Sequence, residues 1–272
     1  MSQYQLIALD LDGTLLNSQK QVPAESALLI DEITKAGKTV VFCTGRAVTE
    51  LTDYYDALPG IRYAVFASGA GLYDIKERRA FSFRAIPREQ AEEILALAKT
   101  KDVMPQIVLA DRDVIQKSHM DALEHFHMGL YRPLYEKAMT LVPDIYAFAE
   151  ECREDFLKIN LYHAVPPERE KTRSQLSHLR MEKAYSEVSS LECSALGVDK
   201  GTGLLRLCGA LGIDATVCVA VGDADNDIPM IRTAGLGVAM GNAAEHVRAA
   251  AKWVVKDLDH GGCAQALRIM LD

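Results

Sequence analysis

Residues 5–14, QLIALDLDGT, join a short apolar run to two carboxylates and a turn. An unbroken apolar run that ends at a turn signal is typical of a strand buried on both faces, and a Gly-Thr pair supplies that signal here. The stretch therefore predicts a buried strand over residues 5–10. This strand delivers Asp10 and Asp12 at its carboxyl end.

The rest of the N-terminal part alternates helices and strands. Apolar runs predict strands at 38–43 and 62–67, and helical patterns ended by Gly or Pro predict helices at 23–36 and 46–58. Strands that are apolar throughout and alternate with helices indicate a parallel sheet covered on both faces.

The same alternation returns near the C-terminus. We expect strands at 217–221, 236–240 and 253–255, and helices at 201–211, 228–233, 243–251 and 265–271. The intervening stretch is richer in charge, His and aromatic residues, and its roughly 100 residues suffice for a domain of their own. The sequence thus predicts an α/β fold. Its doubly wound, Rossmann-like parallel-sheet core comprises residues 1–83 and 189–272, with an inserted α/β domain over 84–188.

Composition narrows the function. The chain has 272 residues, 49% of them hydrophobic, and a formal net charge of −8. This charge disfavours bulk attraction to nucleic acid or to an anionic membrane. None of the six cysteines forms a C-x-x-C pair, which favours buried thiols in a reducing compartment. Because no run resembles a signal peptide or a membrane span, we expect a cytoplasmic protein without nucleic-acid or membrane partners. The sequence makes no prediction about oligomeric state.

Three of the predicted strands end in polar turns that contain glycine: 10–14 (DLDGT), 44–46 (TGR) and 222–227 (GDADND). Ligands bind outside the carboxyl ends of parallel strands, so these turns predict one shared site. So many carboxylates raise one another's pKa unless a counter-charge is present, and all-oxygen ligands favour Mg²⁺ over Zn²⁺. A Mg²⁺ site beside glycine turns and a hydroxyl predicts phosphate chemistry.

These motifs resemble those of the haloacid dehalogenase (HAD) superfamily of phosphotransferases. Residues 10–16 are similar to its first motif, 44–46 to its second, Lys200 to its third and 222–227 to its fourth. Their order and separation resemble the Cof-type sugar-phosphate phosphatases, in which a cap is inserted after the third core strand, and Gly241-Asn242-Ala243 also matches that subgroup. The resemblance implies a HAD-like core, a cap that sets specificity, and hydrolysis of small phosphorylated metabolites such as sugar phosphates.

The resemblance also implies a role for each matched residue. Asp10 would be the nucleophile that forms an aspartyl phosphate, and Asp12 the general acid and then the general base. Mg²⁺ would be held by the carboxylates of Asp10 and Asp223 and by the backbone carbonyl of Asp12, with Asp227 binding the water molecules on the metal. The groups holding the phosphoryl oxygens would belong to Leu11, Thr44, Gly45, Lys200 and Asn226.

Some residues leave alternatives open. Ser68 stands where Asn is common in the subgroup, so contacts beside the substrate are not carried over at that position. Arg46 is either a partner for a core carboxylate or a possible substrate contact. His119, His125 and His127 are compatible with a second metal site, with a contact to the leaving group, or with a solvated surface.

Three other functions fit parts of the pattern. A phosphomutase of the same fold would share the D-x-D-G-T strand but return the phosphoryl group to its sugar. A signalling receiver domain also uses Asp, Mg²⁺, Thr and Lys, but it is under half this length and its Lys follows the last acidic position, whereas Lys200 precedes Asp223. A phosphate-binding protein without turnover is disfavoured because every expected catalytic group is present. The sequence therefore predicts a Mg²⁺-dependent phosphatase.

Overall fold

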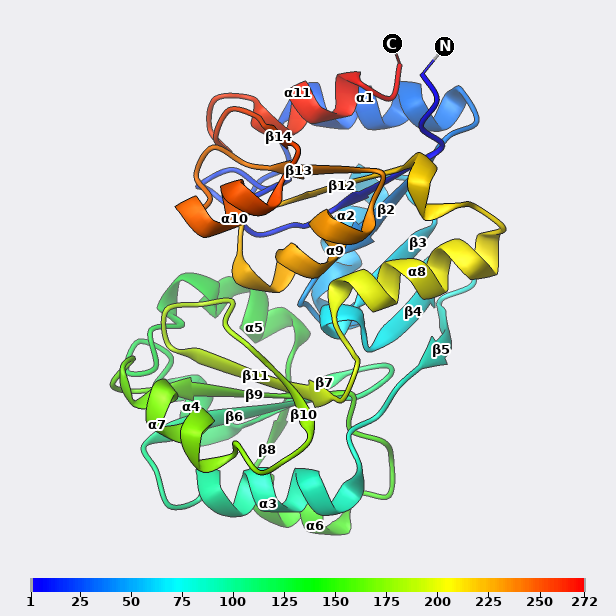
Figure 1. Ribbon diagram of the computed structural model, residues 1–272. Helices are drawn as coiled ribbons and strands as arrows, with labels where there is room; N and C mark the ends of the chain where they lie inside the picture. Colours follow the sequence, from blue (N-terminus) through cyan, green and yellow to red (C-terminus); the bar gives the residue numbers. More distant parts are fainter. Residues whose placement is uncertain (1, 272) are drawn as a thin grey trace. The chain divides into compact units, whose positions relative to one another are not determined.

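The computed structural model describes residues 2–271, which form two compact units (Figure 1). Unit 1 contains the chain up to Gly45, Thr52–Ser82, and the chain from Asp199 onward. Unit 2 contains Arg46–Leu51 and Phe83–Val198. No helix formed by residues 2–271 has both the length and the apolar character that crossing a membrane requires.

Unit 1 is built on an eight-stranded sheet. In order across the sheet its strands are β14 (Trp253–Val254), β13 (Leu236–Ala239), β12 (Cys218–Gly222), β1 (Leu6–Leu9), β2 (Thr39–Cys43), β3 (Tyr63–Phe66), β4 (Gly71–Asp74) and β5 (Arg79–Phe83). The strands from β14 to β3 pair in parallel, which confirms the predicted doubly wound sheet. The antiparallel β4 forms a hairpin with β3 that the sequence analysis did not predict.

Helices cover both faces of this sheet. They are α1 (Ala24–Lys35), α2 (Thr52–Ala57), α8 (Lys200–Leu211), α9 (Ile228–Thr233), α10 (Glu245–Ala250) and α11 (Gly262–Arg268). On one face, Leu6 and Ala8 of β1 pack with Leu204 and Leu207 of α8. Side chains alternate along a strand, so Ile7 faces the opposite side of the sheet, where α1 and α11 lie side by side in Figure 1. Burying one large apolar side chain of this kind stabilises the folded state by ~1.5–3 kcal/mol relative to leaving it exposed.

Helix α8 has well-defined ends, and its first residue is Lys200. Asp199 caps its start by accepting a hydrogen bond from the Thr202 backbone N–H at 2.7 Å, while the Thr202 hydroxyl accepts one from the Asp199 N–H at 3.0 Å. This reciprocal arrangement is a capping box. The helix ends at Gly212, which adopts the left-handed conformation with φ 67°. The capping box thereby sets where the Lys200 side chain leaves the helix.

Unit 2 has its own six-stranded sheet. In order its strands are β10 (Met181–Ala184), β11 (Ser190–Ala195), β9 (Lys158–His163), β6 (Val103–Val108), β7 (Asp113–Gln116) and β8 (Thr140–Val142). Its helices are α3 (Arg88–Ala98), α4 (Lys117–Asp121), α5 (Arg132–Ala138), α6 (Ile145–Glu151) and α7 (Glu168–Gln175). One apolar cluster joins α3 and α6 to the sheet, and a second joins α4 and α5 to it.

The limits of unit 2 differ from the expected range 84–188 in two places. Strand β11 pairs with β9 and β10, which keeps the chain in the unit 2 sheet as far as Val198. Residues 46–51 also belong to unit 2, where the Thr49 hydroxyl donates to Asp113 Oδ1 at 2.6 Å. The helix expected at 46–58 is instead a 3₁₀ turn, Val48–Leu51, followed by α2.

Two glycines of α8 provide a matched test of the packing between α8 and the β3 side of unit 1. A Cβ at position 203 would lie 2.6 Å from Val65 Cγ1 and 2.7 Å from the Gly69 Cα, whereas at position 209 it would meet nothing within 4 Å. We expect Gly203→Ala to lower the free energy of unfolding by ~1–3 kcal/mol because backbone must shift. Gly209→Ala should raise it by ~0.5–1 kcal/mol through helix propensity. Urea denaturation of both variants measures the difference, and equal effects would contradict the packing described here.

Candidate active site

The carboxyl edge of the unit 1 sheet gathers the predicted side chains. Asp10 follows β1, Thr44 follows β2 and Asp223 follows β12, while Lys200 begins α8. Asp10, Thr44 and Lys200 are all buried. Parallel strands bring their carboxyl ends to one edge, which is how segments more than 200 residues apart in the sequence meet there.

Lys200 holds two of the carboxylates. Its Nζ lies 2.6 Å from Asp10 Oδ1 and 2.6 Å from Asp227 Oδ1. The other oxygen of Asp227 accepts hydrogen bonds from the backbone N–H groups of Asp223 and Ala224, each at 2.9 Å. Asp227 therefore ties Lys200 to the turn that carries Asp223.

Asp223 is positioned by two residues that sequence analysis did not assign to the site. The Thr14 hydroxyl donates to Asp223 Oδ1 at 2.9 Å. Asn242 donates to the carbonyl oxygen of Gly13 at 2.9 Å and to Asp223 Oδ2 at 3.4 Å. Thr14 belongs to the D-x-D-G-T motif and Asn242 to the Gly-Asn-Ala match. The sequence analysis therefore included both residues in its motifs but predicted no contact with Asp223 for either.

Gly13 is required at its position for two reasons. Its φ is 91°, in the left-handed region that side chains disfavour, and a Cβ there would lie 2.3 Å from Asp223 Oδ2. The turn after β1 can therefore approach the turn after β12 only through a residue without a side chain.

Asp12 lies in a different environment from Asp10. Lys20 Nζ lies 2.8 Å from Asp12 Oδ1, and the Asp12 side chain is 22% exposed against 7% for Asp10. The sequence analysis did not predict the pairing of Asp12 with Lys20. The one available signal was that the two residues are close in the sequence. Two carboxylates in unlike environments are suited to unlike chemical roles.

The site is short of positive charge. Burial raises the pKa of Asp10 well above its usual value, although Lys200 opposes the shift. Burial and the neighbouring Asp227 raise the pKa of Asp223 to about 7. Burial lowers the pKa of Lys200, but Asp10 and Asp227 outweigh it and leave that pKa well above its usual value. The single ammonium group of Lys200 therefore has to compensate the charge of three closely spaced carboxylates.

This charge balance fits a divalent cation. Asp10, Asp223 and Asp227 each offer an oxygen, and these oxygens lie within 4.8 Å of one another. A donor set of oxygens alone suits a hard cation such as Mg²⁺. A cation bound there would offset the repulsion that raises the carboxyl pKa values.

Other predicted residues are placed as follows. Thr44 and Asn226 are buried in unit 1. Arg46 belongs to unit 2, where its Nη1 donates to the Glu50 carbonyl oxygen at 3.3 Å. Ser68 is buried and adopts φ 55°, a left-handed conformation in which Asn is also well tolerated.

The three histidines of unit 2 make other contacts. His125 Nε2 lies 2.9 Å from Asp102 Oδ2, and His127 Nε2 lies 3.0 Å from the Ala164 carbonyl oxygen. His119 packs edge-on against Phe126. Within residues 2–271 these histidines join no cluster of three potential metal ligands, so the second metal site considered from the sequence has no support here.

A doubly wound sheet with a strand-end aspartate, a buried lysine and a carboxylate cluster is suited to an enzyme of phosphoryl transfer. Comparison with known proteins identifies the family, since residues 7–267 match the model of the haloacid dehalogenase-like hydrolases. This chain belongs to that family, and its resemblance to the Cof-type subgroup is confirmed.

Relatives match along nearly the whole chain. Phosphatase YwpJ of Bacillus subtilis (strain 168) is 28% identical, covering 98% of this chain and 99% of its own. Pyridoxal phosphate phosphatase YbhA of Escherichia coli (strain K12) is 28% identical, covering 96% of each. A solved haloacid dehalogenase-like hydrolase from B. subtilis has a TM-score of 0.86 and 27% identity, covering 97% of this chain and 99% of that one. The chain is accordingly a phosphoric monoester hydrolase.

Removing Lys200 tests the balance of charge. Lys200→Met leaves Asp10 and Asp227 buried without their cation, so we expect a loss of ~3–5 kcal/mol in the free energy of unfolding in metal-free buffer. The loss should be larger at pH 8 than at pH 5. A carboxyl group whose folded-state pKa is raised costs stability as pH rises above its unfolded value. Urea denaturation with EDTA at both pH values measures this.

The matched control is Lys35→Met, because Lys35 pairs with Asp31 on the exposed surface of the same unit. Its effect should stay within about 0.5 kcal/mol at both pH values. A Lys200→Met protein as stable as the control at pH 8 would show that the buried ion pairs do not hold the site together.

Proposed function

We propose that this protein hydrolyses small phosphorylated metabolites, such as sugar phosphates, through an aspartyl-phosphate intermediate, with Mg²⁺ as its cofactor. The observation that carries the proposal is the buried Asp10 carboxylate, paired with Lys200 at 2.6 Å inside a cluster of oxygen ligands. The alternative functions lack a comparable supporting observation.

In the first step, one Asp10 carboxylate oxygen attacks phosphorus in line, and the bond from phosphorus to the alcohol oxygen breaks. Asp12, protonated at that stage, gives its proton to the departing alcohol. In the second step, water attacks phosphorus, Asp12 takes the proton back, and Asp10 leaves as a carboxylate with release of inorganic phosphate. The Asp12 side chain is 22% exposed, so its carboxyl group can exchange protons with solvent.

Residues around Asp10 hold the phosphoryl group and the cofactor in this proposal. Mg²⁺ would be held by the carboxylates of Asp10 and Asp223 and by the carbonyl of Asp12, and Asp227 would bind water molecules on the ion. When bound, the ion supplies positive charge to the phosphoryl oxygens. Further contacts to those oxygens come from Leu11 N–H, Thr44, Gly45, Lys200 and Asn226.

Selection of the leaving group is assigned to unit 2, with Arg46 as a possible contact. Unit 2 carries buried polar side chains on one face of its sheet, among them Gln106, Lys158 and Asn160. The Asn160 Oδ1 is buried without a hydrogen-bond partner, an unusual state that a polar ligand group would relieve. Polar recognition of this kind suits a hydroxylated or otherwise hydrophilic leaving group.

Phosphate release tests the proposal. We expect inorganic phosphate from some members of a panel of sugar phosphates, pyridoxal phosphate and nucleotides, and no release with EDTA. Asp10→Asn should abolish release, because the amide is a far weaker nucleophile, while circular dichroism and the melting temperature stay close to wild type. Asp31→Asn, an exposed change in the same unit, should keep full activity.

Retained activity in Asp10→Asn would overturn the nucleophile assignment. Phosphate transfer that requires a bisphosphate activator, with no net release, would instead favour a mutase.

Asp12→Ala tests the acid–base role separately. With p-nitrophenyl phosphate, whose leaving group needs little protonation, we expect a burst of about one nitrophenolate per active site. Steady-state turnover should then be at least ~10²-fold slower, because no base activates water. Stopped-flow absorbance measures both phases. Asp225→Ala removes an exposed carboxylate from the turn after β12 and should leave both phases unchanged, whereas wild-type turnover in Asp12→Ala would refute the role.

A further inference from the structure

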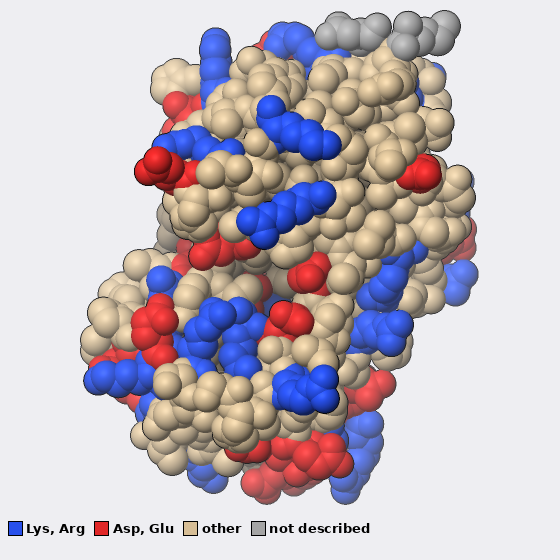
Figure 2. Space-filling view, viewed as in Figure 1, with Lys and Arg blue, Asp and Glu red and all other residues tan. Residues whose placement is uncertain are grey.

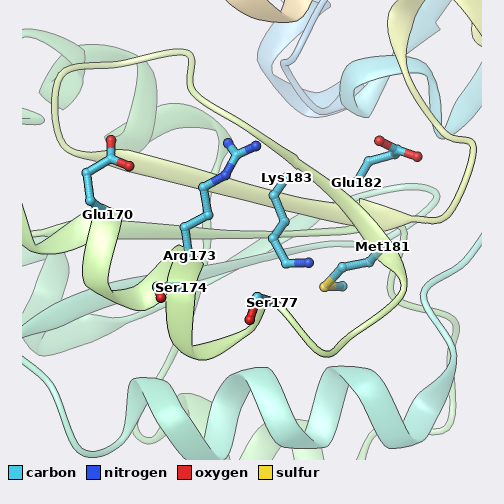
Figure 3. Close-up of a pocket in the computed structure, with 7 residues that line it drawn as sticks. All are labelled: Glu170, Arg173, Ser174, Ser177, Met181, Glu182 and Lys183. Carbon is cyan, nitrogen blue, oxygen red and sulfur yellow. The ribbon is translucent and has the colours of Figure 1, made fainter.

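A hollow of about 420 Å³ lies within unit 2, between helix α7 and strand β10 (Figure 3). Its volume falls in the range of small-molecule sites, about 300–1,000 Å³. It is lined by Glu170, Arg173, Ser174, Ser177, Met181, Glu182 and Lys183. None of these residues belongs to the candidate active site.

A polar stripe of α7 and the residues just after it form one wall. Residues 170, 173, 174 and 177 follow the spacing that puts side chains on one helical face. The opposite wall is β10, an edge strand that pairs only with β11 in the described sheet. Met181 and Lys183 share one face of this strand, and Figure 3 shows both reaching toward Ser177 at the end of the helix. The exposed polar face of α7 therefore forms one side of an open hollow.

The acidic groups of the hollow are already engaged. Glu170 Oε2 accepts a hydrogen bond from the Tyr185 hydroxyl at 2.7 Å. Glu182 Oε1 accepts one from the Gly197 backbone N–H at 2.8 Å. Neither carboxylate forms an ion pair with Arg173 or Lys183.

The two cations of the hollow contact uncharged groups. Within residues 2–271, neither Arg173 nor Lys183 has a carboxylate oxygen within 4.0 Å of its side-chain nitrogens. Lys183 donates to the Leu179 carbonyl oxygen at 2.9 Å, and the Arg173 guanidinium lies 5.1 Å from the centre of the Tyr185 ring. The hydroxyls of Ser174 and Ser177 donate no hydrogen bond in this part of the chain.

The two cations also act on each other. Burial lowers the pKa of Lys183, and the nearby Arg173 guanidinium lowers it further. In Figure 2, basic side chains gather on the viewed face of unit 2, over α7 and β10. An anion between Arg173 and Lys183 would relieve this repulsion and accept hydrogen bonds from charged donors, which are stronger than neutral ones.

We propose that this hollow binds a small organic oxyanion through Arg173 and Lys183, with Ser174 and Ser177 as additional donors. A phosphate ester and a carboxylate share the required chemistry. The hollow is larger than one phosphate group, so it also accommodates the organic part of the ligand, against Met181. This assignment does not depend on the proposed hydrolysis.

The test uses full-length protein with ¹³C-labelled methionine methyl groups, in EDTA, observed by NMR. Sodium phosphate and sodium citrate are titrated separately at constant ionic strength set with NaCl. Met181 reports on the hollow, and Met230 reports on unit 1. We expect a saturable Met181 shift with phosphate, citrate or both, and the tighter probe identifies the kind of oxyanion preferred.

Variants make the assignment specific. Arg173→Gln and Lys183→Gln should each weaken the dissociation constant by at least about tenfold, since each removes a charge-assisted contact. Arg180→Gln removes an exposed charge nearby without lining the hollow, and it should keep the wild-type value within about twofold. Shifts confined to Met230, a Met181 shift that does not saturate, or an unchanged constant in both lining variants would overturn the proposal.

Discussion

The buried contacts of Lys200 with Asp10 and Asp227 are the constraint on which the site depends. A lysine is seldom buried without carboxylate partners, and here each partner is itself tied to a different strand end. Asp10 ends β1, and Asp227 holds the turn after β12 through two backbone N–H groups. The capping box at Asp199 determines where Lys200 enters. One ammonium therefore links helix α8 to two neighbouring strands of the core.

The same cluster explains how an acidic protein handles an anionic substrate. Three carboxylates around one ammonium are a poor phosphate site by themselves, as the raised pKa values of Asp10 and Asp223 indicate. They are, however, a good site for a hard divalent cation. Asp12 is more exposed than Asp10, and its carboxylate pairs with Lys20 rather than with Lys200. Chemical difference between two aspartates two positions apart thus arises from their surroundings.

Sequence reasoning predicted the core strands and the motif residues because both are local signals. Apolar runs mark β1, β2, β3 and β12, and carboxyl ends of parallel strands share an edge. It did not predict that β11 belongs to unit 2, because strand pairing is a long-range choice. Nor did it predict the contacts of Thr14 and Asn242 with Asp223, since these depend on how two turns approach one another. The hollow beside α7 combines residues whose individual patterns are those of a solvated surface.

The placement of β1 has a consequence for how the protein is made. β1 lies between β2 and β12, so one of its two neighbours is synthesised more than 200 residues after it. At elongation rates of ~5–20 residues per second, the N-terminal segment waits roughly 10–40 s for that neighbour. The long stretch Phe83–Val198, by contrast, is continuous and emerges complete before Lys200 does. During this interval an apolar strand stands with one edge unpaired, a state in which nascent chains rely on chaperones.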